Sequence, residues 1–244
     1  SYLDGVDLTR QEFYENLPGY DTFPTTAAPA PAAFTAAYQE LVDEGATEIV
    51  SLHIATKLSN TLNAARLGAE DVEGARVTMW DTQQLALGSG LQAIVAAEAA
   101  ADGRSMPEIL ALLEEKREKI RIFAMLDTLE FLRRSGRVSW TEFGLGTLLR
   151  VKPIVQVYEG EVSMIEKVRT SRRAIPRLVE LVESYGPLDR IALQYAGSVN
   201  AAERWRQEAK DLFPPDEEIT IMELTPAIGS HAGPGVVGLG FIAK

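Results

Sequence analysis

The chain has 244 residues, a formal net charge of −11 and no cysteine. Disulfides and thiolate metal sites are therefore excluded. The acidic balance argues against DNA and anionic membranes as partners, because both bind positively charged surfaces. The longest apolar stretch, GVVGLGFIA, is much shorter than the roughly 20 residues that span a membrane. Because the first residues also show no signal-peptide pattern, we expect a cytoplasmic protein that contacts membranes transiently at most.

The first half of the chain alternates helix-forming and strand-forming segments. Thr9 and Glu12 match a capping box, as do Ser105 and Glu108 further along. The predicted elements are a helix to about 17, a helix over 31–44, the strand TEIVSLHI, a helix capped by Ser59 and ending near 69, the strand ARVTMWD, and helices over 84–102 and to about 118. Alternation of this kind predicts a doubly wound parallel sheet.

The second half mixes a hairpin with strand–helix pairs, which predicts a mixed sheet. The predicted elements are the strand KIRIFAM, a helix from Asp127 to Gly136, a hairpin turning at Glu159–Gly160, a helix over 171–185, the strand DRIALQY, a helix over 200–212, the strand EITIMEL and a last strand over 236–243. We therefore expect two α/β domains, residues 1–118 and 119–244.

Several signatures of catalysis are missing from the sequence. It contains no nucleophile elbow, no Walker loop and no GxGxxG that joins a strand to a helix. The only two histidines, His53 and His231, are far apart in the sequence, and no HExxH motif is present. These absences argue against metal binding and against the common hydrolase mechanisms.

Polar loops at strand ends are the remaining candidates for a binding site. Ser59 and Asn60 follow a predicted buried strand at the start of a helix, where backbone N–H groups can bind an anion. The same segment can equally be a plain helix cap. His231 lies in the glycine-rich stretch IGSHAGPG, which favours a function, whereas His53 inside a strand is expected to be a packed core residue. Arg137 follows RRSG, which can also be a basic helix end closed by Gly136.

Six segments in this order resemble the DegV family, the bacterial fatty-acid-binding proteins that serve as binding subunits of fatty acid kinase. They are TTAAPAP, LSNTL, WDTQQLALGSG, LDTLEFLRRSGRVS, the stretch from LLRVKPIV to KVRTSRRA, and IGSHAGPG. The sequence departs from the family pattern at Ala27 and Ala28, which replace serine and glutamine, and at Asn60, which replaces glycine. The two strands with which the family begins are also missing.

The resemblance implies that a long-chain fatty acid binds between the two domains. Thr26, Ser59, Asn60 and His231 are then expected to bind its carboxylate, and Arg137 and Arg169 to contact the phosphates brought by a separate kinase subunit. The chain itself would be a monomer without a cofactor and would catalyse nothing alone. Two alternatives stay open: a small-molecule enzyme that uses His231 as a base on an anionic or phosphorylated substrate, and a structural or regulatory protein whose pocket has lost its ligand.

Overall fold

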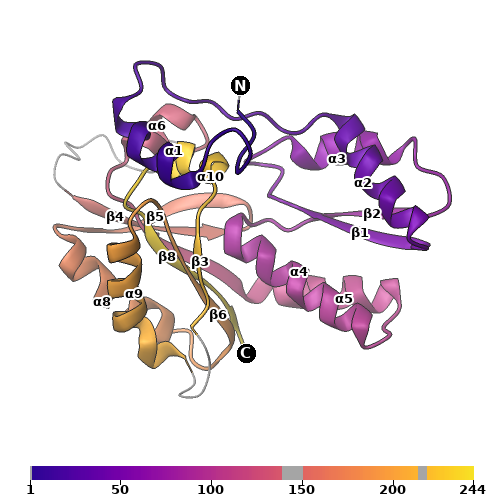
Figure 1. The fold of residues 1–244 in the computed structure, drawn as a ribbon. Helices are drawn as coiled ribbons and strands as arrows, with labels where there is room; N and C mark the ends of the chain where they lie inside the picture. The colour runs from indigo at the N-terminus through magenta and orange to yellow at the C-terminus, as the bar shows by residue number, and fades with distance from the viewer. Residues whose placement is uncertain (1, 139–150, 214–218) are drawn as a thin grey trace. The chain divides into compact units, whose positions relative to one another are not determined.

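The computed structural model describes residues 2–138, 151–213 and 219–244. They divide into two units (Figure 1). Unit 1 comprises residues 1–26, 120–157 and 162–244, and unit 2 comprises residues 27–119 and 158–161. The division after Lys119 lies next to the boundary expected from the sequence. The first 26 residues, however, group with the second half of the chain, so the units differ from the ranges 1–118 and 119–244.

Unit 2 is built on two parallel strands. β1 (Glu48–His53) and β2 (Arg76–Asp81) pair from Glu48↔Arg76 to His53↔Asp81. Helices cover both faces of this pair (Figure 1). They are α2 (Pro31–Asp43) and α3 (Thr61–Ala69) on one face, and α4 (Ala86–Ala101) and α5 (Met106–Lys119) on the other. The predicted doubly wound parallel arrangement is confirmed, here with two strands.

A chain of polar side chains lies on the face of the unit 2 sheet that α2 covers. The Tyr38 hydroxyl is 2.6 Å from Ser51 Oγ, which in turn is 2.7 Å from His53 Nε2. The ring of His53 also meets Phe34 edge-on, with the centroids 5.5 Å apart. His53 is thus packed against its neighbours but only partly buried, which differs from the core position expected from the sequence.

Unit 1 contains a six-stranded mixed sheet in the order β5-β4-β3-β8-β6-β7. Its strands are β3 (Ile120–Met125), β4 (Lys152–Tyr158), β5 (Glu161–Val168), β6 (Leu188–Tyr195), β7 (Ile221–Glu223) and β8 (Val237–Ala243). The helices are α1 (Arg10–Asn16), α6 (Glu130–Ser135), α8 (Ser171–Glu183), α9 (Val199–Ala209) and α10 (Pro226–Ala232). β8 runs antiparallel to both β3 and β6, and so joins the two sides of the sheet.

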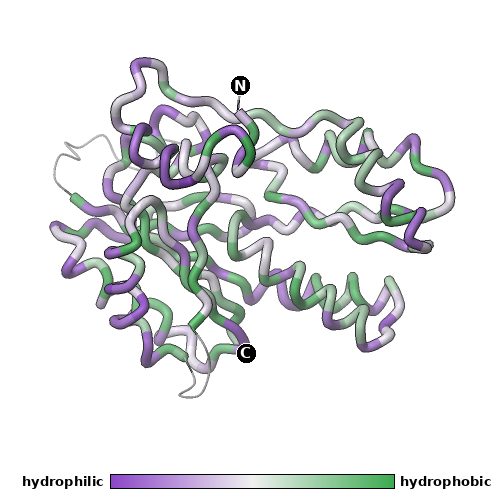
Figure 2. Tube along the Cα trace, in the orientation of Figure 1, coloured by the Kyte–Doolittle hydropathy of each residue, from purple (hydrophilic) through white to green (hydrophobic). Residues whose placement is uncertain are grey.

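The core of unit 1 lies between this sheet and the helices α8 and α9. Trp205 of α9 is fully buried, and its Nε1 donates a hydrogen bond to the carbonyl of Gly238 at 2.8 Å. Figure 2 shows the central strands as largely hydrophobic, whereas α8 alternates between hydrophilic and hydrophobic residues. This alternation places Ala174, Leu178 and Val182 against the core and leaves the charged face of α8 exposed.

Two predicted helix starts are wrong by a few residues. Asn60 is the N-cap of α3, one residue after the expected Ser59. Asp127 does not cap α6, because its carboxylate pairs with Lys152 of β4, and α6 begins only after Leu129. In contrast, Thr9 and Glu12 form the predicted capping box of α1. No helix among the described residues is long and apolar enough to cross a membrane.

Candidate functional site

A hydroxyl and an imidazole from distant parts of the sequence meet in unit 1. Thr26 Oγ1 and His231 Nε2 are 2.9 Å apart. The other ring nitrogen, Nδ1, is buried and has no hydrogen-bond partner among the described residues. A buried polar atom without a partner costs about 1–3 kcal/mol. The pair therefore keeps one unused hydrogen-bonding position on the imidazole.

His231 is held in place by the helix that carries it. The first five residues of IGSHAGPG, expected to be a loop, form the end of α10, which begins with Pro226 after Thr225 and ends at Ala232, with Gly233 as its C-cap. Gly229 of α10 lies against Tyr14 of α1, whose hydroxyl donates a hydrogen bond to the carbonyl of Leu224 at 2.8 Å. Contacts that precede His231 in the sequence therefore hold α10 against α1.

α6 and the segment before Thr26 complete this cluster. A Cβ on Gly233 would lie 2.4 Å from the ring of Phe131, so the end of α10 rests directly on α6. Phe23 contacts the same Phe131 ring at a centroid distance of 5.7 Å, which anchors the segment that leads to Thr26. The Thr26–His231 pair thus results from the packing of three separate segments.

The electrostatics favour a neutral imidazole at this position. Burial lowers the pKa of His231, and the positive charge of Arg137 lowers it further. Arg137 follows α6, which is closed by Gly136 in the left-handed conformation, as the sequence suggested. The Arg137 side chain is exposed and donates a hydrogen bond to the carbonyl of Ser135 at 2.5 Å. One exposed cation therefore acts on the ring of His231.

Ser59 and Asn60 lie together in unit 2, at the start of α3. Ser59 Oγ is 2.7 Å from Thr61 Oγ1 and accepts a hydrogen bond from the N–H of Thr61 at 3.3 Å. Asn60 is exposed, and its side chain makes no capping hydrogen bond. Two of the predicted anchors are thus adjacent, and of the two only Ser59 bonds to the N–H of the first residue of α3.

Arg169 lies at a different place in unit 1. It precedes Thr170, the N-cap of α8, on a groove that it shares with Lys167, Arg172 and Arg173. All four side chains are exposed. The groove is a local basic surface on an acidic protein, and it is presented by β5 and α8 rather than by α6 and α10.

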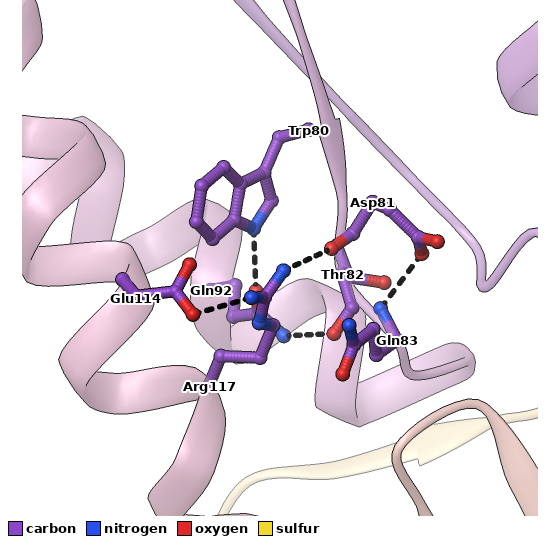
Figure 3. Close-up of polar contacts among 7 residues, drawn as sticks. All are labelled: Trp80, Asp81, Thr82, Gln83, Gln92, Glu114 and Arg117. Carbon is purple, nitrogen blue, oxygen red and sulfur yellow. Dashed lines mark hydrogen bonds and ion pairs between the residues drawn. The ribbon is translucent and has the colours of Figure 1, made fainter.

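Two further residues emerge only from the structure. Asp81 ends β2, and its carboxylate bonds to Thr56 in the loop after β1 and to Gln83 in the loop after β2, the second of which Figure 3 shows. Gly160, at the tip of the β4–β5 hairpin, donates its N–H to the carbonyl of Gln83 at 2.8 Å. For Asp81 the sequence contains one indication, because an aspartate side chain at a turn often accepts the backbone N–H of the residue two positions later.

The described residues contain no group of three or more histidine, aspartate and glutamate side chains placed to hold a metal ion. A hydroxyl beside an imidazole is also the first half of a nucleophile–base arrangement. Its third member, a group that orients the other ring nitrogen, is missing here, because Nδ1 of His231 has no partner within the described part of the chain. This geometry is more suitable for binding than for nucleophilic catalysis.

Comparison with known proteins gives a consistent result. The family model of DegV, described as a family of uncharacterised proteins, matches residues 1–244. A DegV domain-containing protein of Deinococcus radiodurans is 36% identical over 242 residues, which cover 98% of this chain and 85% of the relative.

Two solved structures extend this likeness to the fold. A DegV family protein from Thermus thermophilus, reported with fatty acid binding, has 34% identity and a TM-score of 0.89, and the match covers 100% of this chain and 87% of that one. DegV of Bacillus subtilis, described as a fatty acid binding protein, has 29% identity and a TM-score of 0.86 with the same coverage.

Proposed function

The chain belongs to the DegV family, and we propose that it binds a long-chain fatty acid and presents the carboxylate to a separate kinase subunit. The observation that carries this proposal is the likeness, over the whole chain, to the Thermus thermophilus protein reported with fatty acid binding. The geometry of the polar residues supports it independently.

The carboxylate requires several hydrogen-bond donors, because an unpaired buried charge is costly. In unit 1, Thr26 and His231 are in contact, and the neutral imidazole carries one N–H. With the proton on Nδ1, which has no other partner, the ring can donate to a ligand oxygen while Nε2 accepts from the Thr26 hydroxyl. In unit 2, the hydroxyl of Ser59 and the first turn of α3 at Asn60 offer further donors. We infer that these four residues bind the carboxylate.

The acyl chain supplies most of the binding free energy. Burying about fifteen methylenes gains at most about 12 kcal/mol, at about 0.8 kcal/mol each. A membrane offers the same methylenes a similar apolar environment, so this gain offsets the cost of removing the acyl chain from a membrane rather than driving it.

Presentation to a kinase subunit is the second part of the proposal. ATP would supply the phosphoryl group, and the product would be an acyl-phosphate. Arg137 supports this part, because it is exposed and its charge already acts on His231. Arg169 supports it less directly, as one of four exposed cations on the groove of β5 and α8.

Ser59→Ala and His231→Ala test the anchoring residues. Each variant loses a hydrogen bond to an ionised group, so we expect fatty-acid affinity to fall by about tenfold or more. Equilibrium titration with a fluorescent fatty acid measures the dissociation constant, and incubation with the kinase subunit and ATP measures acyl-phosphate formation.

Asn16→Ala is a suitable control, because the exposed Asn16 side chain donates to the carbonyl of Glu12 within α1, away from the proposed anchoring residues. We expect it to bind as the wild type does. Full fatty-acid binding and phosphoryl acceptance by both test variants would overturn the assignment of the anchoring residues.

A further inference from the structure

Two loops leave the same edge of the unit 2 sheet and are tied together there. Residues 54–60 follow β1 and residues 82–85 follow β2, and because the strands are parallel both loops start at their carboxyl ends. The N–H of Ala55 donates to the carbonyl of Gln84 at 2.8 Å, and the hydroxyl of Thr82 donates to the carbonyl of His53 at 2.7 Å. The two loops therefore form one connected structure.

Asp81 is the side chain that bonds to both loops. Its Oδ2 accepts a hydrogen bond from the Thr56 hydroxyl at 2.7 Å and a longer one from the Thr56 N–H at 3.4 Å. Its Oδ1 accepts from the N–H of Gln83 at 2.9 Å (Figure 3). One carboxylate thus uses both oxygens, one for each loop.

The second loop adopts a conformation that needs such support. Gln83 and Ala86 have φ values of 51° and 42°, in the left-handed region that side chains other than glycine rarely adopt. The N–H of Gln83 is held by Asp81, and its carbonyl accepts from Gly160. Strain of this kind persists where neighbouring groups over-determine the backbone, and it is common at ligand-binding loops.

Side chains of α4 and α5 also bond to the end of β2 (Figure 3). Arg117 of α5 donates to the carbonyl of Asp81 at 3.2 Å, and its guanidinium lies 4.8 Å from the centroid of the Trp80 ring. Trp80 donates to Gln92, which donates in turn to the carbonyl of Thr82 at 2.9 Å. The backbone that presents the Asp81 carboxylate is therefore rigid.

The hydrogen bonds of the first loop lead from Asp81 to Ser59. Asp81 holds Thr56, and the preceding residue, Ala55, uses its carbonyl to accept the N–H groups of Leu58 at 2.9 Å and Ser59 at 3.1 Å. Ser59 then orients the first turn of α3 through Thr61. The position of the Ser59 hydroxyl is therefore set by a turn that Asp81 fixes at its start.

We propose that Asp81 is a positioning residue, which holds the loop of residues 55–59 so that Ser59 and the start of α3 face the carboxylate of the ligand. This inference rests on the proposed function and adds a residue to it. Asp81 itself touches no ligand. Its effect is therefore specific to the carboxylate group and independent of the acyl chain.

Asp81→Asn tests this role, because the amide keeps the shape but loses one of the two acceptors. Binding of palmitate and of hexadecanol, which has the same chain length without a carboxylate, is measured side by side by calorimetry. We expect affinity for palmitate to fall by about tenfold and affinity for hexadecanol to change by less than about twofold. Equal losses for both ligands would indicate a merely structural role and overturn the proposal.

Variants of Thr56 test the same contact without changing the aspartate. Thr56→Val removes the hydroxyl and is expected to reproduce the selective loss of palmitate affinity, whereas Thr56→Ser is expected to restore it. Glu108→Gln is the matched control, since Glu108 also accepts from a hydroxyl and a backbone N–H, both of Ser105, at the start of α5. It should leave the affinities for both ligands unchanged.

The double variant Ser59→Ala/Asp81→Asn shows whether Asp81 acts through Ser59. We expect its loss of palmitate affinity to be smaller than the sum of the two single losses, because both changes remove the contribution of the positioned Ser59 hydroxyl. Fully additive losses would overturn the proposal. A wild-type protein that binds no palmitate would contradict the proposed function, whereas equal palmitate binding by wild type and Asp81→Asn would contradict this inference alone.

Discussion

Burial lowers the pKa of both histidines below the ordinary value of 6.5, and at His231 the charge of Arg137 adds to the effect. Both imidazoles are therefore more easily protonated in the unfolded chain than in the folded one. As pH falls below about 6.5, the unfolded state takes up protons first. The stability that the neutral imidazoles contribute is complete above this pH and is lost as pH falls through the folded pKa.

The expected result is a loss of stability of the ligand-free protein as pH falls from neutrality through the ordinary histidine pKa of 6.5 and below it. His231→Gln keeps a polar group near Thr26 but does not titrate, so its free energy of unfolding should depend less on pH in this window than that of the wild type. Urea denaturation at a series of pH values measures the difference, in which the carboxylates common to both proteins cancel. Identical pH dependence of the two proteins would show that His231 is not held neutral.

At the residue scale, the sequence identified side chains better than their partners. Thr26 and His231 were both proposed for one site, but the evidence was the resemblance to a family, since no spacing rule connects residues so distant in the chain. Asp127 was expected to cap a helix, and it instead pairs with Lys152, which β4 brings beside it. In the sequence, Asp81 is one residue of the segment WDTQQLALGSG that resembles the family. The structure shows in addition that its carboxylate bonds to two loops.

At the scale of elements, α10 is the helix that the sequence did not predict. It has seven residues, too few for a periodic apolar pattern, and it contains Gly229. Two residues nevertheless indicate where it begins and ends, because Pro226 occupies its first position and Gly233 follows its last. The longer helices and strands were predicted correctly to within a few residues, because their patterns extend over several turns or alternations.

Gly229→Ala tests how α10 is fixed. A Cβ at this position would lie 2.4 Å from the Tyr14 hydroxyl, so α10 or α1 must move. We expect a loss of about 1–3 kcal/mol in the free energy of unfolding, as for other overpacked sites. Chemical denaturation followed by tryptophan fluorescence gives the value.

Gly90→Ala is the matched control, because Gly90 is also helical and a Cβ there meets nothing within 4 Å. It should stabilise the protein by up to about 1 kcal/mol, since alanine favours the helix over glycine. The packing account would be contradicted if Gly229→Ala stabilised the protein as well.

At the scale of the whole molecule, the sequence predicted the two kinds of sheet but not the grouping of their parts. The first 26 residues belong to unit 1, because Phe13 and Tyr14 of α1 are buried there and α1 packs on α10. The order of the mixed sheet depends on distant pairings such as that of β3 with β8. Gly238 makes this pairing possible, since a Cβ there would lie 2.6 Å from the carbonyl oxygen of Phe123. No local pattern in the sequence contains this information.

The family likeness, the unused Nδ1 of His231 and the Ser59 hydroxyl at the start of α3 together support one central claim, that the protein carries a fatty acid by its carboxylate. Native mass spectrometry of the purified protein, followed by extraction and identification of the bound lipid, tests the claim most directly. The account predicts one long-chain fatty acid per chain, lost or strongly reduced in the Ser59→Ala/His231→Ala double variant. A bound polar metabolite, or a protein that stays empty after incubation with fatty acid, would contradict it.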